Sequence, residues 1–300
     1  MNRLLDRVRK MCENHYDLGF EGVILMDSSC QVLYEKRWTE DYPRDIYSNT
    51  KSFVGAAAGM AIYQNKLSLN TRLVDMLWPS CEVRGGINEI KLFDLLTMRS
   101  GFAEAYLMYF DRRRGTGAED YYDYMFKQQL QYKPGTHYLY SSGDAILVGG
   151  MVEKAVGMTL HHFLYQNMFK QLGIDYPIWE CDLMGHSCGG SGLQLKLKDM
   201  AKLGCLYLSG GYLNGIRFFS EDWPELSFTK YVSLNNKEYE ESYGFLWKIC
   251  YDGKIYKAHG AFGQDTLIFP YENVVLGYQC KEGSNIDRID NVIVHELLCQ

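Results

Sequence analysis

The chain has 300 residues and a formal net charge of −6 at pH 7, from 31 lysine and arginine residues against 37 aspartate and glutamate residues. Its content of 47% hydrophobic and 23% charged residues is ordinary for a soluble globular protein, and its length suits one large domain or two lobes with a shared core. Nucleic acid is not expected as a partner, because phosphate binding requires a basic surface. The one basic run, Arg112 to Arg114, is balanced by neighbouring acidic residues and indicates a solvated loop.

The N-terminal segment, MNRLLDRVRKMCENHYDLGF, has helical spacing of its apolar residues and lacks the apolar core of a secretion signal. No apolar run reaches the roughly 18 residues needed to span a bilayer. The 9 cysteines show neither C-x-x-C nor Cys/His spacing, so we expect no zinc site and no disulfide scaffold. Together these features predict a cytoplasmic, reduced protein that binds neither a metal nor a membrane.

Strand-like segments occupy both ends of the chain, and their hairpin spacing predicts an antiparallel sheet. These segments are residues 21–27, 31–38, 242–251, 254–260, 264–270 and 273–280. The middle of the chain is helical by its periodicity, with Gly157 and Gly173 placed to end two of the helices. The expected helices cover residues 94–98, 119–130, 144–156, 160–170, 197–211 and, at the end of the chain, 287–298.

This order of elements predicts an α+β fold. The antiparallel sheet is built from both chain ends and flanked by terminal helices, and a helical lobe is inserted between them. We expect the sheet domain to comprise residues 1–70 and 188–300 and the helical domain to comprise residues 71–187.

A serine and a lysine three residues apart, Ser48 and Lys51, precede the run of small and apolar residues SFVGAAAGMAI. A buried helix is the natural interpretation of that run, which places Ser48 at the first turn of a helix. Unpaired backbone N–H groups and the helix dipole can stabilise an anion there. Lys51 lies one turn further on the same face, so its amine can reach the serine hydroxyl and act as a base. The alternative is a simple helix cap beside a surface lysine.

The chain contains a second pair with the same spacing, Ser227 and Lys230 in SFTK. No helix of small residues follows it. We therefore interpret Ser227 as a packing or loop residue rather than a nucleophile.

The segment YSNTKSF resembles the S-x-x-K motif of the penicillin-recognising serine hydrolases, which include β-lactamases, D,D-peptidases and related esterases and amide hydrolases. Further stretches resemble the family in the expected order. They are KLSLNTRLVDMLWP, EIKLFDLLTMRSGF, KPGTHYLYSSGDAILVGGMVEKAVGMTL, GGSGLQLKLKDMAKLGCLYLSGG and GFLWKICY with AHGAFGQDTLIFP. The resemblance covers roughly residues 20–280 and implies a β-lactamase/transpeptidase-like fold with Ser48 as nucleophile and Lys51 as base.

The resemblance also assigns the second motif, Tyr-x-Asn in the family. Tyr140 takes the place of the tyrosine that carries protons between the nucleophile and the leaving group. Ser142 stands where asparagine is usual and can still donate a hydrogen bond to substrate or contact Lys51. The version YSSGD resembles the branch of 6-aminohexanoate-oligomer hydrolases more than the β-lactamases.

The third motif, Lys-Thr-Gly or His-x-Gly in the family, falls on HGAFGQ. His259 then takes the cationic position among the substrate-binding residues, and Gly260 allows close approach of the backbone. Ala261 stands where the glycine of the motif is expected, so the register is open. The second N–H of the oxyanion hole could belong to Ala261, Phe262 or Gly263.

The resemblance implies a serine hydrolase that cleaves a small amide or ester through an acyl-enzyme, without metal or organic cofactor. One alternative is a D,D-peptidase or β-lactamase, against which the missing export signal counts. The other is a catalytically silent binding protein of the same fold, against which the intact Ser48, Lys51 and Tyr140 count. The sequence does not indicate the oligomeric state.

Overall fold

The computed structural model describes residues 2–77, 86–112, 118–234 and 240–298. Its main feature is one sheet of eight strands in the order β2-β1-β12-β11-β10-β9-β8-β7, with antiparallel pairing throughout. The strands are β1 (Phe20–Asp27), β2 (Val32–Arg37), β7 (Val232–Ser233), β8 (Glu240–Tyr243), β9 (Lys248–Cys250), β10 (Ile255–Ala258), β11 (Gln264–Phe269) and β12 (Val274–Cys280). Because β1 pairs with β12, the sheet joins the two ends of the chain.

Helices cover both faces of this sheet. α1 (Asn2–Asn14) and α11 (Ile286–Leu297) pack on one face, where their apolar side chains meet Val23 and Leu25 of β1. α9 (Leu197–Leu208) packs on the other face, against β1, β11 and β12, and α2 (Thr50–Tyr63) shares its hydrophobic core with Ile24 and Met26. Alternate residues of β1 therefore enter two separate cores, as the two-residue period of a strand requires. Every described helix is too short or too polar to cross a lipid bilayer.

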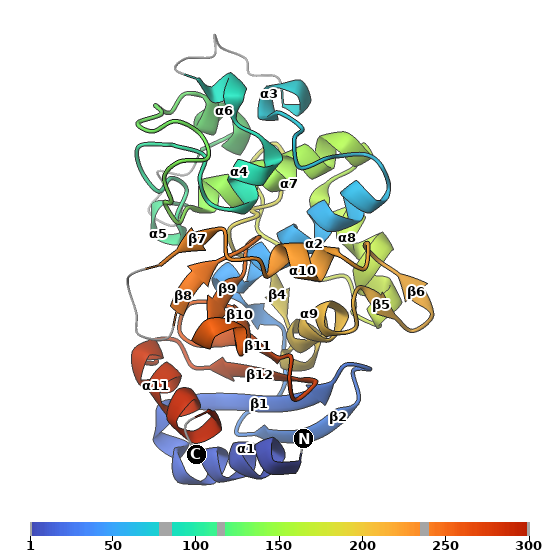
Figure 1. Cartoon of the computed structure of the whole chain (residues 1–300), viewed down its shortest axis with the longest axis vertical. Helices are drawn as coiled ribbons and strands as arrows, with labels where there is room; N and C mark the ends of the chain where they lie inside the picture. The colour runs from blue at the N-terminus through green and yellow to red at the C-terminus, as the bar shows by residue number, and fades with distance from the viewer. Residues whose placement is uncertain (1, 78–85, 113–117, 235–239, 299–300) are drawn as a thin grey trace.

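Most of the remaining helices form a lobe beside and beyond α2, in the upper half of Figure 1. They are α3 (Leu73–Met76), α4 (Leu92–Leu96), α5 (Tyr109–Asp111), α6 (Tyr121–Phe126), α7 (Ser142–Val156) and α8 (Leu160–Leu164). α7 packs against α2, and both are buried along most of their length. Gly59 on α2 also allows Trp223 of α10 (Trp223–Ser227) to approach closely, because a Cβ there would lie 2.4 Å from the indole nitrogen.

The structure confirms the predicted α+β fold, with its sheet from both chain ends, its terminal helices and its inserted helices. The exact domain boundaries, 1–70 with 188–300 and 71–187, stay a prediction. One predicted strand, 242–251, is wrong as a single element, because it is divided into β8 and β9. The strand is interrupted at Gly244, which lies so close to Ser227 that a Cβ would be 2.0 Å from the Ser227 carbonyl oxygen. Leu246 also has a φ of 60°, which a strand does not have.

Candidate active site

Ser48 lies in the short 3₁₀ turn Tyr47–Asn49 that leads directly into α2. One helical turn later, Lys51 points its Nζ atom at the serine and donates a hydrogen bond of 3.0 Å to Ser48 Oγ. Lys51 is only 1% exposed, although it is a lysine at the start of a helix. Lys51 is therefore a buried lysine in contact with Ser48 and not a surface lysine beside a helix cap. The roles of Ser48 as nucleophile and Lys51 as base stay a prediction.

Three further residues surround the Lys51 amine. Its Nζ atom donates to the Gly190 carbonyl oxygen at 2.8 Å and to Ser142 Oγ at 3.4 Å, and it lies 4.8 Å from the centre of the Tyr140 ring. Ser142 is the first residue of α7, while Tyr140 precedes the helix in the chain. The structure thus brings together four of the expected site residues, Ser48, Lys51, Tyr140 and Ser142, from two helix starts.

Asp45 fixes the turn that carries Ser48. Its Oδ1 atom accepts the backbone N–H of Tyr47 at 2.7 Å and that of Gly192 at 3.2 Å. The second bond links the turn to the segment that supplies the Gly190 carbonyl. Gly190 must be a glycine there, since a Cβ would lie 2.5 Å from Ser142 Cβ. Sequence reasoning missed Asp45 and Gly190, because their role depends on contacts between segments far apart in the chain.

The third motif forms the turn between β10 and β11, and this turn packs against the chain just before Ser48. A Cβ at Gly260 would lie 2.2 Å from the Ile46 carbonyl oxygen, so only glycine fits. Asn49 holds the turn from the other side. Its Nδ2 atom donates to the carbonyl oxygens of Ala258 at 3.3 Å and Gln264 at 3.0 Å. The turn that contains Ala261 is therefore seated next to Ser48, as the resemblance implies.

The His259 side chain is hydrogen-bonded to the carboxylate of Asp265. Its Nδ1 atom lies 2.9 Å from Asp265 Oδ1, which also accepts the backbone N–H of Gly260 at 2.8 Å. Burial, together with the Lys248 ammonium, lowers the pKa of His259 below its ordinary value, which favours the neutral imidazole. Among the described residues, no hydrogen bond or ion pair joins His259 to Ser48 or Lys51. Its role in binding substrate stays a prediction.

Asp265 itself is fully buried and carries its charge. Burial alone would raise the pKa of this carboxyl, but the Lys257 ammonium at 3.3 Å and His259 hold it well below the ordinary value. Tyr278 donates a further hydrogen bond of 2.6 Å to Asp265 Oδ2. The conformation of the turn is thus held by a buried carboxylate whose two oxygen atoms both have hydrogen-bond partners.

The second serine–lysine pair has no such arrangement. Ser227 is the last residue of α10 (Trp223–Ser227) and is completely buried. The Lys230 side chain is 42% exposed and forms an ion pair with Asp252. The interpretation of Ser227 as a packing residue agrees with this burial.

The expectation of a solvated loop at Arg112 is wrong. The Arg112 side chain is 2% exposed, and its Nε atom donates to Glu180 Oε1 at 2.9 Å. Its other nitrogens donate to the Leu107 carbonyl oxygen and to Ser191 Oγ, next to Gly190. The neighbouring arginines, at 113 and 114, lie outside the described residues. Arg112 is buried because its guanidinium joins two segments that border the site.

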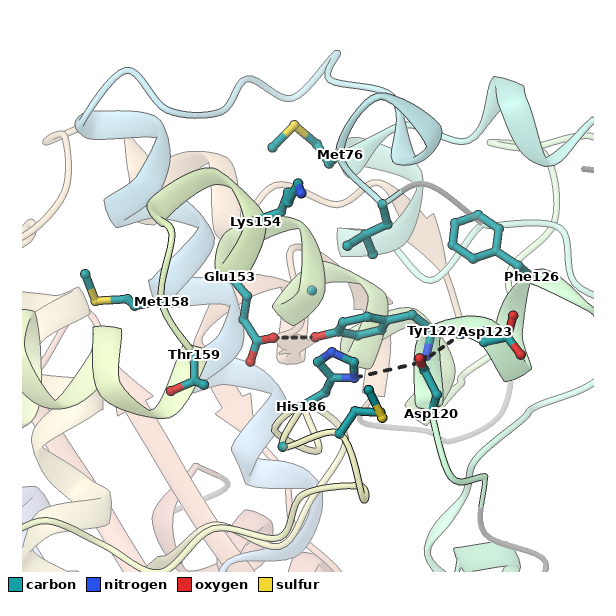
Figure 2. Close-up of a pocket in the computed structure, with 14 residues that line it drawn as sticks. Met76, Asp120, Tyr122, Asp123, Phe126, Glu153, Lys154, Met158, Thr159 and His186 are labelled. Atoms are coloured by element: carbon teal, nitrogen blue, oxygen red, sulfur yellow. Dashed lines mark hydrogen bonds and ion pairs between the residues drawn. The ribbon is translucent and has the colours of Figure 1, made fainter. Parts of the chain in front are cut away.

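A cavity of about 630 Å³ lies away from this site, in the helical lobe (Figure 2). Tyr122 donates to Glu153 Oε2 at 2.8 Å there, and its ring lies 4.0 Å from the His186 ring. Asp120, Asp182 and His186 come within 4.8 Å of one another, a spacing that could hold a metal ion. Both oxygens of Asp182, however, already accept backbone N–H groups. The cluster therefore stabilises its own loop.

Comparison with known proteins identifies the family of this chain. The sequence model of the Beta-lactamase family matches residues 16–291, so the chain belongs to the Beta-lactamase family. Among curated relatives, proteins provisionally named D-alanyl-D-alanine carboxypeptidase from Escherichia coli (strain K12) and Salmonella typhimurium are each 24% identical. The alignments cover 60% and 58% of this chain but only 48% and 47% of those proteins. The match thus spans about half the length of these relatives.

Solved structures share the fold across nearly the whole chain. A protein provisionally named 6-aminohexanoate-dimer hydrolase, from Bacillus anthracis, superimposes with a TM-score of 0.81 at 17% identity, covering 96% of this chain and 80% of its own. EstCE1, described as a hydrolase with promiscuous acyltransferase activity, gives a TM-score of 0.77 at 15% identity and covers 99% and 98%. An octameric penicillin-binding protein homologue from Pyrococcus abyssi gives 0.76 at 17% identity and covers 98% and 77%. At these identities the likeness defines the fold alone.

Proposed function

We propose that this protein is a serine hydrolase that cleaves a small ester or open-chain amide through an acyl-enzyme on Ser48. The observation that carries the proposal is the position of Lys51 Nζ, 3.0 Å from Ser48 Oγ and 4.8 Å from the centre of the Tyr140 ring. A serine hydroxyl is a weak nucleophile until a base accepts its proton, and a buried amine at hydrogen-bonding distance can do so.

In the first half of the reaction, Ser48 Oγ attacks the substrate carbonyl carbon while its proton passes to Lys51 Nζ. Backbone N–H groups of Ser48 and of the turn 259–263 stabilise the negative charge on the carbonyl oxygen. The bond from carbon to the leaving oxygen or nitrogen then breaks. Tyr140 gives its phenolic proton to the leaving group and regains one from Lys51.

In the second half, water adds to the acyl carbonyl and gives a proton to the same Lys51–Tyr140 pair. The ester bond to Ser48 breaks, the serine recovers its proton and the carboxylic acid departs. All protons are carried by side chains of this chain, so the scheme requires no cofactor.

The alternative of a β-lactamase or D,D-peptidase is favoured by the names of the curated relatives and of several structural neighbours. Two features of this chain support the ester or amide instead. Ser142 replaces a longer asparagine, and His259 is a neutral imidazole held by Asp265 where a lysine ammonium would attract the carboxylate of a penicillin. We therefore expect kcat/KM to be lower for nitrocefin than for the p-nitrophenyl ester of a short acid. The opposite order would favour the alternative.

The test of the proposal uses the purified full chain with p-nitrophenyl acetate, followed by mass spectrometry of the protein treated with a fluorophosphonate. We expect hydrolysis and a single covalent adduct on the peptide that contains Ser48. Ser48→Ala should lose both. Equal hydrolysis by wild type and Ser48→Ala would overturn the proposal, and the absence of both hydrolysis and adduct in the wild type would favour a catalytically silent binding protein.

A further inference from the structure

Three aromatic rings gather beside Ser48, from three distant parts of the chain. The Tyr47 ring lies 5.4 Å from the Tyr109 ring and 5.3 Å from the Phe262 ring, with interplanar angles of 65° and 79°. Both contacts are edge-to-face, the arrangement that aromatic pairs prefer. We call Tyr47, Tyr109 and Phe262 the three-ring wall. All three residues are partly exposed, so their rings are not simply part of the core.

Two members of the wall have an unusual backbone. Tyr47 has a φ of 49° and Phe262 a φ of 60°, in the left-handed region that bulky residues rarely occupy. Tyr47 is held in this conformation because Asp45 accepts its backbone N–H. Phe262 lies in the turn that Asp265 and Asn49 fix on either side. Strained residues of this kind concentrate at functional sites, where the surrounding structure enforces them.

The third ring is anchored by Arg112. Tyr109 is the first residue of α5 (Tyr109–Asp111), and Arg112 is the residue that follows this helix. Arg112 donates back to the Leu107 carbonyl oxygen and across to Glu180, so it fixes the segment on both sides of Tyr109. The wall is therefore formed before any substrate arrives, which reduces the conformational entropy lost on binding.

The charges that border the site have partners already. Lys51 donates to three oxygen atoms, Arg112 pairs with Glu180, and His259 bonds to Asp265 through Nδ1. Among the described residues at this site, these three basic groups are therefore poorly placed to receive a substrate carboxylate. An uncharged substrate group fits this environment better than an anionic one.

The position of the wall also indicates which part of the substrate it contacts. Tyr47 immediately precedes Ser48, and Phe262 lies in the turn expected to bind the carbonyl oxygen. Both residues thus adjoin the carbonyl that stays on Ser48 after the leaving group departs. The group attached to that carbonyl is the acyl group.

We propose that the three-ring wall binds the acyl part of the substrate and selects an aromatic or similarly flat, apolar and uncharged acyl group. This inference rests on the proposed function of Ser48. The favourable binding free energy comes from burying the partly exposed rings against the acyl group and from edge-to-face contact with it.

The experiment compares kcat/KM for three p-nitrophenyl esters with the same leaving group, the acetate, the phenylacetate and the hydrogen succinate. In the wild type we expect the phenylacetate to exceed the acetate by about tenfold, and the anionic succinate to fall below the acetate. Tyr109→Ala and Phe262→Ala should each lower the phenylacetate-to-acetate ratio at least about threefold. Phe262→Leu keeps an apolar side chain but removes the ring, and should lower the ratio as well if Phe262→Ala fails to fold.

Tyr271→Ala is the matched control, because this tyrosine is 79% exposed at the turn between β11 and β12, at the other end of β11 from the wall. It should keep the wild-type ratio. A wild-type ratio near one, or a ratio that all the wall variants retain, would overturn this inference while leaving Ser48-dependent hydrolysis intact. Hydrolysis of the acetate that survives Ser48→Ala would overturn the proposed function and this inference with it.

Discussion

Lys51 donates a hydrogen bond of 2.8 Å to the Gly190 carbonyl oxygen, which is shorter than its bond to Ser48. A carbonyl oxygen can only accept, so this bond is kept whether Lys51 is an ammonium or a neutral amine. The Gly190 carbonyl therefore holds the side chain in the position that the proposed proton transfer requires. The lone pair of the neutral amine can then be directed at the Ser48 hydroxyl.

Lys51→Ala and Lys51→Arg should both lower kcat for ester hydrolysis by about 10² or more, the scale expected for losing general base catalysis. Arginine keeps the charge but cannot give up its proton at neutral pH, so it should not rescue the activity. Lys230→Ala serves as the control, because this lysine is exposed and paired with Asp252. Substantial activity in Lys51→Arg would mean that the cation matters and that another group is the base.

Tyr140→Phe should lower kcat by about 10² or more while the thermal unfolding temperature changes little, since only the phenolic oxygen is removed. Tyr138→Phe is a matched control two residues away, and both tyrosines contact the ring of Tyr243. The ratio of the two kcat values is the measurement. If Tyr140→Phe matches Tyr138→Phe, the proton for the leaving group comes from elsewhere.

A fluorophosphonate should label Ser48 and leave Ser227 untouched. Ser227 has no exposed surface, and the lysine three residues later points to Asp252 instead of the serine. Peptide mapping of the labelled wild type and of Ser48→Ala separates the two sites. An adduct on Ser227 that persists in Ser48→Ala would show that the wrong serine has been assigned.

Asp144 should make the protein less stable as the pH rises from about 4 to about 7. Burial raises the pKa of Asp144 from 3.8 to about 7, although Ser100 donates a hydrogen bond of 2.8 Å to it. Between these values the folded state keeps a proton that the unfolded state has lost, so the free energy of unfolding falls with rising pH and levels off above pH 7. Asp144→Asn removes this contribution.

Urea unfolding of wild type and Asp144→Asn across this pH range provides the measurement. Asp144→Asn should gain stability relative to the wild type as the pH rises, by up to about 4 kcal/mol for a shift of this size. A difference in unfolding free energy that stays constant with pH would contradict a buried, protonated Asp144.

The sequence predicted the elements that local periodicity determines. The S-x-x-K spacing placed Lys51 beside Ser48 because one helical turn brings such residues together. The resemblance placed Tyr140 and Ser142 on the second motif, and both lie at Lys51. Gly157 and Gly173 end their helices with positive φ as expected, although α8 widens into a π-helical turn, Tyr165–Phe169, before it reaches Gly173.

Contacts between distant segments were beyond sequence reasoning. The burial of Arg112 depends on Glu180 and Ser191, which only the folded chain brings near it. The break between β8 and β9 depends on the approach of Gly244 to Ser227. The three-ring wall joins residues more than 200 positions apart, and a local pattern carries no information about such pairs. The direction of the His259 ring likewise depends on Asp265, which lies across the turn on β11.

The pairing of β1 with β12 has a consequence for the order of events during synthesis. Asn49, next to Ser48, hydrogen-bonds to Ala258, Gln264 and Thr266, so the segment that carries Ser48 is synthesised long before the segments that pack around it. Contacts across such long separations close slowly and favour partly folded intermediates while the ribosome is still at work. A nascent chain that has not yet reached β11 lacks the hydrogen-bond partners of Asn49. The activity proposed for Ser48 can therefore appear only after β11 has been synthesised and has packed against Asn49.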